Sequence, residues 1–193
     1  MLRICAGLFK GKHLKLPPEL VSMPSSDRLR QAVFNILTNM LNFNELRILD
    51  AFAGSGALGL EALSRGAVAV VFCENNLQVQ AVLKENILSI GKSINNKVTI
   101  TRDIFDLTAA YPFDVIFLDP PYDKGLEVKA LQYLLDQKLI AQNGIVVVEQ
   151  RKGGVAIEHS DFTIQPPRVY GKCQITFLQL KITLSILTSQ TIN

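Results

Sequence analysis

The 193-residue sequence predicts an α/β fold, in which helices cover both faces of a mostly parallel sheet. From residue 46 onward, short apolar runs alternate with amphipathic segments, which is typical of parallel strands joined by crossover helices. The last two apolar runs follow each other without an intervening helix, which predicts an antiparallel C-terminal edge strand. An excess of basic residues near the N-terminus predicts a small extension in front of this sheet.

The expected strands are short runs rich in Val, Ile and Phe, and most of them are apolar enough to be buried on both faces. They are residues 46–50, 68–74, 97–101, 113–119, 144–149, 162–165 and 174–181. Apolar residues recur at helical spacing in the segments between them. The expected helices are residues 57–65, 76–91 and 125–138.

The N-terminal extension is expected to contain a small β-hairpin and a helix. Two short strands, residues 2–5 and 13–16, flank a turn region with two glycines, and the prolines that follow keep the chain extended. A helix should begin near Ser26, with Ser26 or Asp27 as its N-cap. We therefore divide the chain into the extension (1–42), a main domain (43–181) and a tail without a readable signal (182–193).

Charge is distributed unevenly along the chain. Residues 1–30 contain six basic and two acidic residues, a net charge of +4, whereas the remaining 14 basic and 15 acidic residues give −1. A basic arm on a near-neutral body predicts contact with a polyanion, and a merely solvated basic face is the open alternative. The basic residues of this segment are Arg3, Lys10, Lys12, Lys15, Arg28 and Arg30. The last two lie outside the apolar stripe of the expected helix, so we expect both to be exposed.

Composition excludes several classes of protein. With 48% hydrophobic and 19% charged residues the chain is not disordered, and no apolar run approaches the roughly 18 residues of a membrane span. No signal peptide is recognisable before Lys10 and Lys12. Three well-separated cysteines and two histidines, His13 and His159, predict neither disulfides nor a metal site. We expect a reduced, metal-free cytoplasmic protein.

A glycine-rich loop follows the first strand. Gly54-x-Gly56-x-x-Gly59 matches a dinucleotide-binding fingerprint, which alone is a weak signal that an empty Gly-rich connection would also produce. Glu74 closes the second strand 18 positions after Gly56, where it could accept hydrogen bonds from both hydroxyls of a ribose. Asp50, before the loop, would repel a pyrophosphate but could pair with an ammonium group. A nucleoside with a positive tail is indicated: S-adenosylmethionine fits and NAD does not.

Asp103 and Ile104 follow the third strand. Asp103 could accept a hydrogen bond from an adenine amino group, with Ile104 beside the ring, although a helix cap is an equally open role for this aspartate. The residues expected to contact the cofactor are Asp50, Phe52, Gly54, Gly56, Glu74, Asn75, Asp103 and Ile104.

The most specific motif is Asp119-Pro120-Pro121-Tyr122, at the end of the fourth strand. Ligands of open α/β sheets bind outside the carboxyl ends of the strands. The two prolines fix the backbone and remove local donors, so its carbonyl groups remain rigid acceptors. Asp119 adds a carboxylate and Tyr122 adds an aromatic face for stacking. Together they predict a socket for a planar molecule with an NH2 group.

With its glycine fingerprint, this motif resembles the amino-methyltransferases that use S-adenosylmethionine. More narrowly, residues 2–181 resemble the bacterial 16S rRNA guanine-N2 methyltransferases of the RsmD type. The shared segments are Arg3-Ile4 with Gly7 and Gly11, residues 24–30, Phe34-Asn35, residues 50–66, Glu74 and residues 119–122, and one departure is Met23, where relatives usually have arginine. The resemblance implies a Rossmann-like seven-stranded methyltransferase sheet.

The resemblance also implies a reaction. The 2-amino group of a guanine in small-subunit rRNA would attack the methyl group directly, held by Asp119 and the Pro120 carbonyl and stacked on Tyr122, with S-adenosylhomocysteine as the product. The expected partner is 16S rRNA within a partly or fully assembled small subunit, and the enzyme is expected to be a monomer. The expected phosphate contacts are Arg3, Lys10, Lys12, Arg28 and Arg30.

Three alternatives remain at this stage. A DNA adenine amino-methyltransferase would use the same motif, but the 71 residues after Tyr122 leave no room for a DNA target-recognition domain. An NAD-dependent oxidoreductase is opposed by Asp50. A non-catalytic nucleic-acid-binding module would need the basic arm but not Asp119 and Tyr122.

Overall fold

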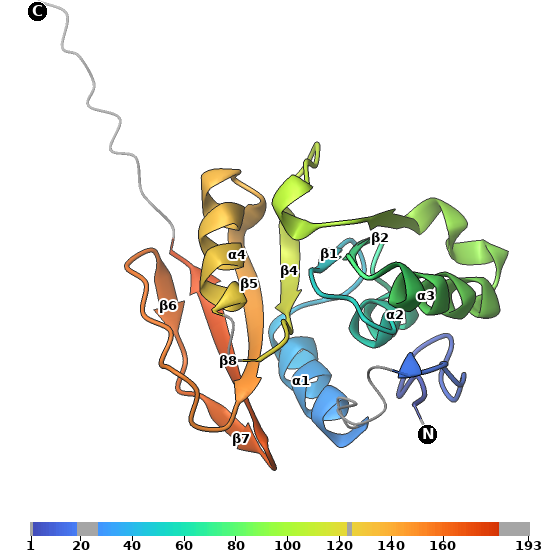
Figure 1. The fold of residues 1–193 in the computed structure, drawn as a ribbon, viewed down its shortest axis with the longest axis horizontal. Helices are drawn as coiled ribbons and strands as arrows, with labels where there is room; N and C mark the ends of the chain where they lie inside the picture. Colours follow the sequence, from blue (N-terminus) through green and yellow to red (C-terminus); the bar gives the residue numbers. More distant parts are fainter. Residues whose placement is uncertain (1, 19–26, 123–124, 182–193) are drawn as a thin grey trace, which may run out of the picture.

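The computed structural model describes residues 2–18, 27–122 and 125–181, and these form one sheet with helices on both faces (Figure 1). The expected cap Ser26, the departure at Met23 and the tail 182–193 lie outside the described residues. The helices are α1 (Asp27–Met40), α2 (Ala57–Ser64), α3 (Leu77–Ile90) and α4 (Leu126–Asp136), with 3-10 turns η2 (Lys92–Lys97) and η3 (Ile104–Asp106). The strands are β1 (Arg47–Asp50), β2 (Ala69–Cys73), β3 (Val98–Thr101), β4 (Phe113–Leu118), β5 (Ile140–Arg151), β6 (Phe162–Ile164), β7 (Arg168–Tyr170) and β8 (Cys173–Leu180).

The strands are ordered β3-β2-β1-β4-β5-β8-β6, and β7 also pairs with β8. The first five are parallel, whereas β8 is antiparallel to β5, which confirms the predicted sheet and its antiparallel edge. The sequence predicts seven strands, and the structure has eight because the outermost strand is divided. β6 and β7 pair with successive parts of β8, and Pro166 and Pro167 between them cannot donate to the ladder.

Two segments differ from the sequence-based expectation. β5 begins at Ile140 rather than at residue 144, and Asn143 takes a positive φ of 64° near a shift of register against β4. The N-terminal hairpin is reduced to a single bridge between Arg3 and His13. Its ladder is short because the chain turns away at Cys5 to bond with helix α2.

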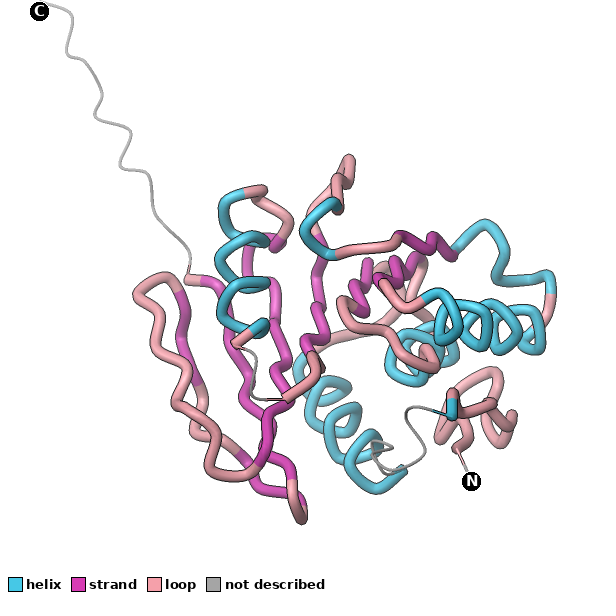
Figure 2. Tube along the Cα trace, viewed as in Figure 1, coloured by secondary structure: helices cyan, strands magenta, loops and turns pink. Residues whose placement is uncertain are grey.

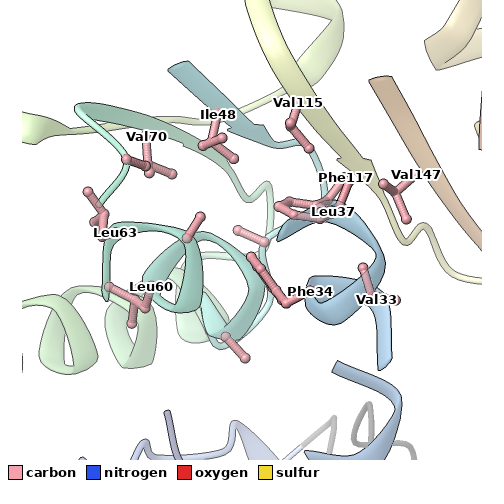
Figure 3. Close-up of a cluster of buried hydrophobic side chains, with 14 of the residues drawn as sticks. Val33, Phe34, Leu37, Ile48, Leu60, Leu63, Val70, Val115, Phe117 and Val147 are labelled. Carbon is pink, nitrogen blue, oxygen red and sulfur yellow. The ribbon is translucent and has the colours of Figure 1, made fainter. Parts of the chain in front are cut away.

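The core has two parts, one on each face of the sheet. Residues of α1, α2 and α3 pack on one face, and residues of α4 and η3 on the other (Figure 2). Figure 3 shows Phe34 and Leu37 of α1 beside Phe117 of β4, and Phe34 and Leu37 are completely buried. The boundary expected at residue 42 therefore does not separate two cores, because the helix of the extension completes the core of the main domain.

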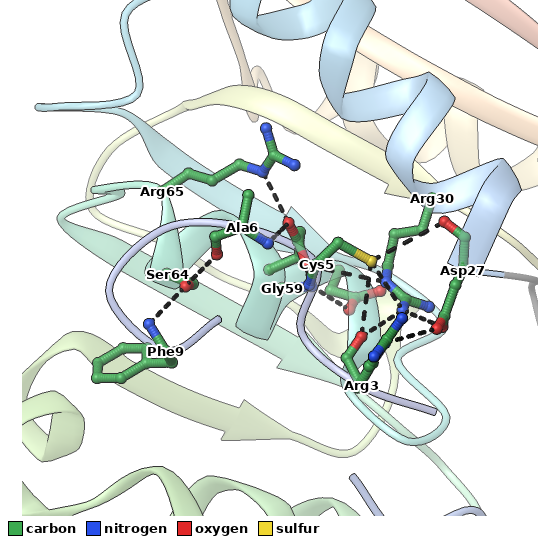
Figure 4. A network of polar contacts seen from close by, with 11 residues as sticks. Arg3, Cys5, Ala6, Phe9, Asp27, Arg30, Gly59, Ser64 and Arg65 are labelled. Atoms are coloured by element: carbon green, nitrogen blue, oxygen red, sulfur yellow. Dashed lines mark hydrogen bonds and ion pairs between the residues drawn. The ribbon is translucent and has the colours of Figure 1, made fainter. Parts of the chain in front are cut away.

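A network of buried charges attaches the N-terminal arm (residues 2–16) to α2 (Figure 4). The carboxylate of Glu61, which is fully buried, accepts hydrogen bonds from the backbone N–H groups of Cys5 at 2.6 Å and Ala6 at 3.1 Å. It also pairs with Arg65 at 2.8 Å. The arm approaches the last turn of α2 so closely that a Cβ on Gly7, whose φ is +80°, would lie 1.8 Å from the Ser64 carbonyl oxygen.

Arg30 belongs to this network, and the expectation that it is exposed and contacts RNA phosphates is wrong. Its side chain is 0% exposed and donates to Asp27 at 2.7 Å and to the Arg3 carbonyl at 2.6 Å. Its Nε lies 4.0 Å from the Glu61 carboxylate. The apolar stripe of α1 did not indicate that Arg30 is buried, because its partner Glu61 is a buried charge on another helix, α2.

We predict that Glu61→Ala lowers the free energy of unfolding by about 3–5 kcal/mol, since it leaves Arg30 and Arg65 without their shared buried partner. Urea unfolding measures this loss. Glu85→Ala is the matched control, because Glu85 binds Lys15 of the same arm through an exposed pair at 2.7 Å. The control should cost at most about 1 kcal/mol. Equal losses in the two variants would contradict the role assigned to Glu61.

Candidate functional site

The carboxyl ends of the parallel strands place several acidic residues along one edge of the sheet. Asp50 ends β1, Glu74 follows β2 and Asp103 follows β3. Burial raises the pKa of the Cys73 thiol, and the negative charges of Asp50, Asp103 and Glu74 raise it further. All three carboxylates therefore lie close enough to act on one sulfur atom.

The glycine-rich loop between β1 and α2 is attached to this edge through its backbone. The N–H of Gly54 donates to Glu74 Oε2 at 2.9 Å, and the N–H of Asn76 donates to Oε1 at 2.9 Å. Gly56 precedes α2 in the left-handed region, with φ 80° and ψ 15°. Each carboxylate oxygen has a second lone pair, so Glu74 retains acceptor sites for hydroxyl groups of a ligand.

Asp50 lies beneath the same loop. It is 2% exposed, and its Oδ2 accepts a hydrogen bond of 2.9 Å from the N–H of Gly59 in the first turn of α2. Burial, with a smaller effect of the Glu74 charge, raises the pKa of Asp50 to about 7 although the Gly59 bond opposes this. A cation beside this carboxylate would favour its charged form, whereas a pyrophosphate would be repelled.

The remaining predicted cofactor contacts lie around these acids. Asp103 accepts a hydrogen bond from the N–H of Phe105 at 3.1 Å and caps η3, which is the cap role that the sequence left open. Ile104 is buried, Phe52 is half-buried and Asn75 is exposed. Contacts of these four residues with a cofactor stay predictions.

The Asp119-Pro120-Pro121-Tyr122 segment follows β4, two strands from Glu74 in the sheet. Asp119 lines a hollow of about 280 Å³, counting the solvent at its mouth, between α1 and the ends of β4 and β5. The hydroxyl of Tyr122 donates to Glu149 Oε1 at 3.0 Å and lies 3.1 Å from the sulfur of Cys173. Burial raises the pKa of Tyr122, and the contact with Cys173 and the charges of Glu149 and Asp119 add to this. The tyrosine ring is therefore held as a neutral platform.

The sequence patterns did not single out two buried polar residues near the site. Glu149 ends the apolar part of β5, just as Asp119 follows that of β4, and an acid at the end of a buried strand was the signal available. Asn86 of α3 donates to the carbonyl groups of both Lys15 and Ser55 at 2.9 Å, so it joins the basic arm to the glycine-rich loop. Nothing in the local sequence distinguishes Asn86 from a surface residue.

Four of the basic residues expected to bind phosphate are exposed, namely Arg3, Lys10, Lys12 and Arg28. In Figure 1 the arm and the first turn of α1 lie at the end of the molecule toward which β4 runs, which is also the end that bears Asp119. The structure thus brings these cations and the acidic edge to the same end of the molecule.

Within the described part of the chain, no cluster of three or more His, Cys, Asp or Glu side chains is arranged to hold a metal ion. None of the helices in these ranges has the length and apolar character that crossing a bilayer requires.

Comparison with known proteins places these features in a context. The model of a family described as Conserved hypothetical protein 95 matches residues 2–179. Ribosomal RNA small subunit methyltransferase D of Haemophilus influenzae is 33% identical over 174 residues, covering 88% of this chain and 89% of that protein. The protein of the same name from Escherichia coli is 30% identical over 172 residues, covering 89% and 86%. A solved structure described as a methyltransferase, yhhF of Escherichia coli, superposes with a TM-score of 0.80 at 27% identity and covers 94% of this chain and 99% of that one.

We predict that Asp50→Asn stabilises the ligand-free protein by an amount that grows with pH. The folded state holds a proton on Asp50 up to about pH 7, whereas the unfolded chain loses it near its ordinary pKa of 3.8. The folded state thus binds more protons between these values, so wild-type stability falls as pH rises through this window, and the asparagine variant escapes this loss. The difference should grow by up to about 1.4 kcal/mol per pH unit and level off above pH 7–8.

Urea unfolding of both proteins at pH 5, 6, 7 and 8 measures this difference. Other carboxyl groups titrate equally in the two proteins and cancel. A difference that does not change with pH would contradict the raised pKa of Asp50.

Proposed function

The chain belongs to the family described as Conserved hypothetical protein 95, and from this premise we propose that it transfers a methyl group from S-adenosylmethionine to the 2-amino group of a guanine in 16S rRNA. The observation that carries the proposal is the match, over most of both chains, to relatives named ribosomal RNA small subunit methyltransferase D. The position of Asp119-Pro120-Pro121-Tyr122 at the strand edge supports an amino group as the acceptor.

The acidic edge fits the proposed cofactor. Glu74 accepts the ribose hydroxyls, Asp103 accepts from the adenine amino group and Ile104 packs against the ring. Asp50, buried and without a strong preference for its charged form, favours a ligand that brings a positive charge beside it. Gly54 and Gly56, with Phe52 and Asn75, shape the approach to the helix. When bound, S-adenosylmethionine supplies an electrophilic methyl group and leaves as S-adenosylhomocysteine.

Asp119 and the Pro120 carbonyl orient the attacking nitrogen. The lone pair of an aromatic amine is delocalised into the ring, so the amine is a poor nucleophile. Two acceptors that hold its N–H groups favour localisation of the lone pair and align the nitrogen with the methyl group. Tyr122, held by Glu149, stacks on the base and offsets part of the stacking that the base loses on leaving the RNA. Asp119 need not be a strong base, because the amine proton becomes acidic only after methyl transfer.

The exposed cations of the arm and of α1 provide the RNA contact. Arg3, Lys10, Lys12 and Arg28 neutralise phosphates around the target, and the buried network at Glu61 fixes the arm in place. The 1–42 segment is thus the RNA-binding extension, and 43–181 contains the cofactor site. We propose an enzyme that acts as a monomer, in the cytoplasm, on a partly or fully assembled small subunit.

We predict that Asp119→Ala slows methyl transfer roughly a hundredfold to a thousandfold, since it removes one acceptor of the transition state. Asp119→Asn should retain more activity because its amide oxygen still accepts. Single-turnover transfer of labelled methyl groups to undermethylated small subunits measures the rate, with naked 16S rRNA as a second substrate. Mass-spectrometric mapping of methylated nucleosides identifies the product. A product other than N2-methylguanosine, or no product on either substrate, would overturn the proposed function.

Glu74→Ala tests the cofactor subsite, as Asp119→Ala tests the site of the amino group. It should weaken binding of S-adenosylmethionine at least tenfold in calorimetry, because two hydrogen bonds to a carboxylate are lost, whereas Asp119→Ala should leave that affinity nearly unchanged. Cofactor affinity that falls equally in both variants would contradict the separation of the two subsites.

We predict that replacing Lys10, Lys12 and Arg28 together with Ala weakens RNA binding but not cofactor binding. Each phosphate contact that is lost should reduce the slope of log K against log salt by roughly 0.7–0.9. Lys129→Ala is the control, because Lys129 is also exposed but lies on α4, on the opposite face of the sheet. A triple variant with the wild-type salt slope would show that the arm is only a solvated surface.

A further inference from the structure

A second carboxylate stands beside Asp119. In the parallel pair of β4 and β5, Leu118 is opposite Val148, so Asp119 and Glu149 are the next residues in register. Side chains alternate between faces along a strand. Asp119 therefore shares a face with Phe117, and Glu149 shares that face with Val147, both of which belong to the core beneath α1. The two carboxylates lie side by side on one face, Asp119 directly after β4 and Glu149 two residues before the end of β5.

Both residues line the hollow of about 280 Å³ described above. Its walls are mostly apolar and are formed by residues such as Val33, Phe117 and Val147. Arg30 also lines it, and the Nε and Nη1 of this buried guanidinium are without hydrogen-bond partners among the described residues. Apolar walls with two carboxylates and a buried guanidinium suit one flat polar ring.

Glu149 has the chemistry of a receptor for an N–H group. Glu149 is 7% exposed, and its carboxylate already accepts a hydrogen bond from the Tyr122 hydroxyl at 3.0 Å. An ionised carboxylate has about four lone-pair sites, so it can accept from a further donor in the hollow. It cannot donate, so an acceptor atom placed against it would be repelled and would remain unpaired.

We propose that Glu149 is a recognition residue for the target base, accepting the N1–H of the guanine whose 2-amino group Asp119 holds. This inference rests on the proposed function and adds the selection of guanine to it. In guanine the N1–H and the 2-amino group are adjacent donors, so two carboxylates side by side match them. In a purine that has the 2-amino group but no N1–H, N1 is an acceptor and faces Glu149 unfavourably.

A purely structural role would make Glu149 only a support for Tyr122. Two substitutions separate the roles. Tyr122→Phe removes the hydroxyl that bonds to Glu149 but leaves the carboxylate, whereas Glu149→Gln keeps the size and places an amide, which can donate as well as accept, in the hollow. The support role predicts that each variant slows all substrates by one factor. The recognition role predicts that only Glu149→Gln changes the ratio between substrates.

The test uses small subunits reconstituted with 16S rRNA that has either guanine or 2-aminopurine at the mapped target. 2-Aminopurine keeps the reacting 2-amino group and lacks the N1–H. In single-turnover methyl transfer, wild type should prefer guanine by roughly ten- to a hundredfold. Glu149→Gln should lose most of this preference, since its amide can donate to N1 of 2-aminopurine as well as accept from the N1–H of guanine. Glu149→Asp, which keeps an acceptor, should keep the preference for guanine.

Several outcomes would overturn the inference. Equal rates of wild type on both bases would show that N1–H is not read, and equal slowing of both bases by Glu149→Gln would reduce Glu149 to a support for Tyr122. Cofactor affinity and the urea midpoint verify that the variants fold, and the wild-type preference for guanine is itself a test that needs no variant. Absence of transfer by wild type to subunits containing guanine would instead overturn the proposed function, so the two failures are distinguishable.

Discussion

The parallel pairing of β1 with β2 on one side and β4 on the other is the constraint on which the site depends. Parallel strands present their carboxyl ends at the same edge, so each residue that follows a strand is brought to one place regardless of its distance along the chain. The acids at the ends of β1 and β2 and the Asp-Pro-Pro-Tyr segment after β4 converge for this reason alone. The local hydrogen bonds then orient them: Gly54 to Glu74, and Gly59 to Asp50.

Buried polar residues connect this edge to the N-terminal arm. Glu61 binds the backbone of the arm from α2, the helix that begins at the glycine-rich loop. Asn86 reaches from α3 to the arm at Lys15 and to the loop at Ser55. Both links are made in the interior, where an unpaired polar group is costly, so the arm has one favoured position relative to the loop. The part of the protein that we assign to RNA is thus fixed to the part that we assign to the cofactor.

The strand edge and the N-terminal arm carry opposite charges, which suit different ligands. The strand edge gathers carboxylates, which suits a cationic cofactor and the N–H groups of a base but would repel the phosphates of an RNA. Exposed cations on the arm and on α1 lie at the same end of the molecule and compensate for that repulsion. The net charge of +3 hides this division, because the basic excess lies in the first 30 residues.

The sequence by itself determined the strand and helix order and the residues at the strand ends, because both depend on local periodicity and on motifs that lie within a few positions of each other. Asp50, Glu74 and Asp119 were found in this way. Only the tertiary structure decided the state of Arg30, which is buried because Glu61 of another helix faces it, and the pairing of Glu149 with Tyr122 across neighbouring segments. It also decided that α1 belongs to the main core. These features depend on which segments meet in space, and a pattern along one segment contains no information about its partner.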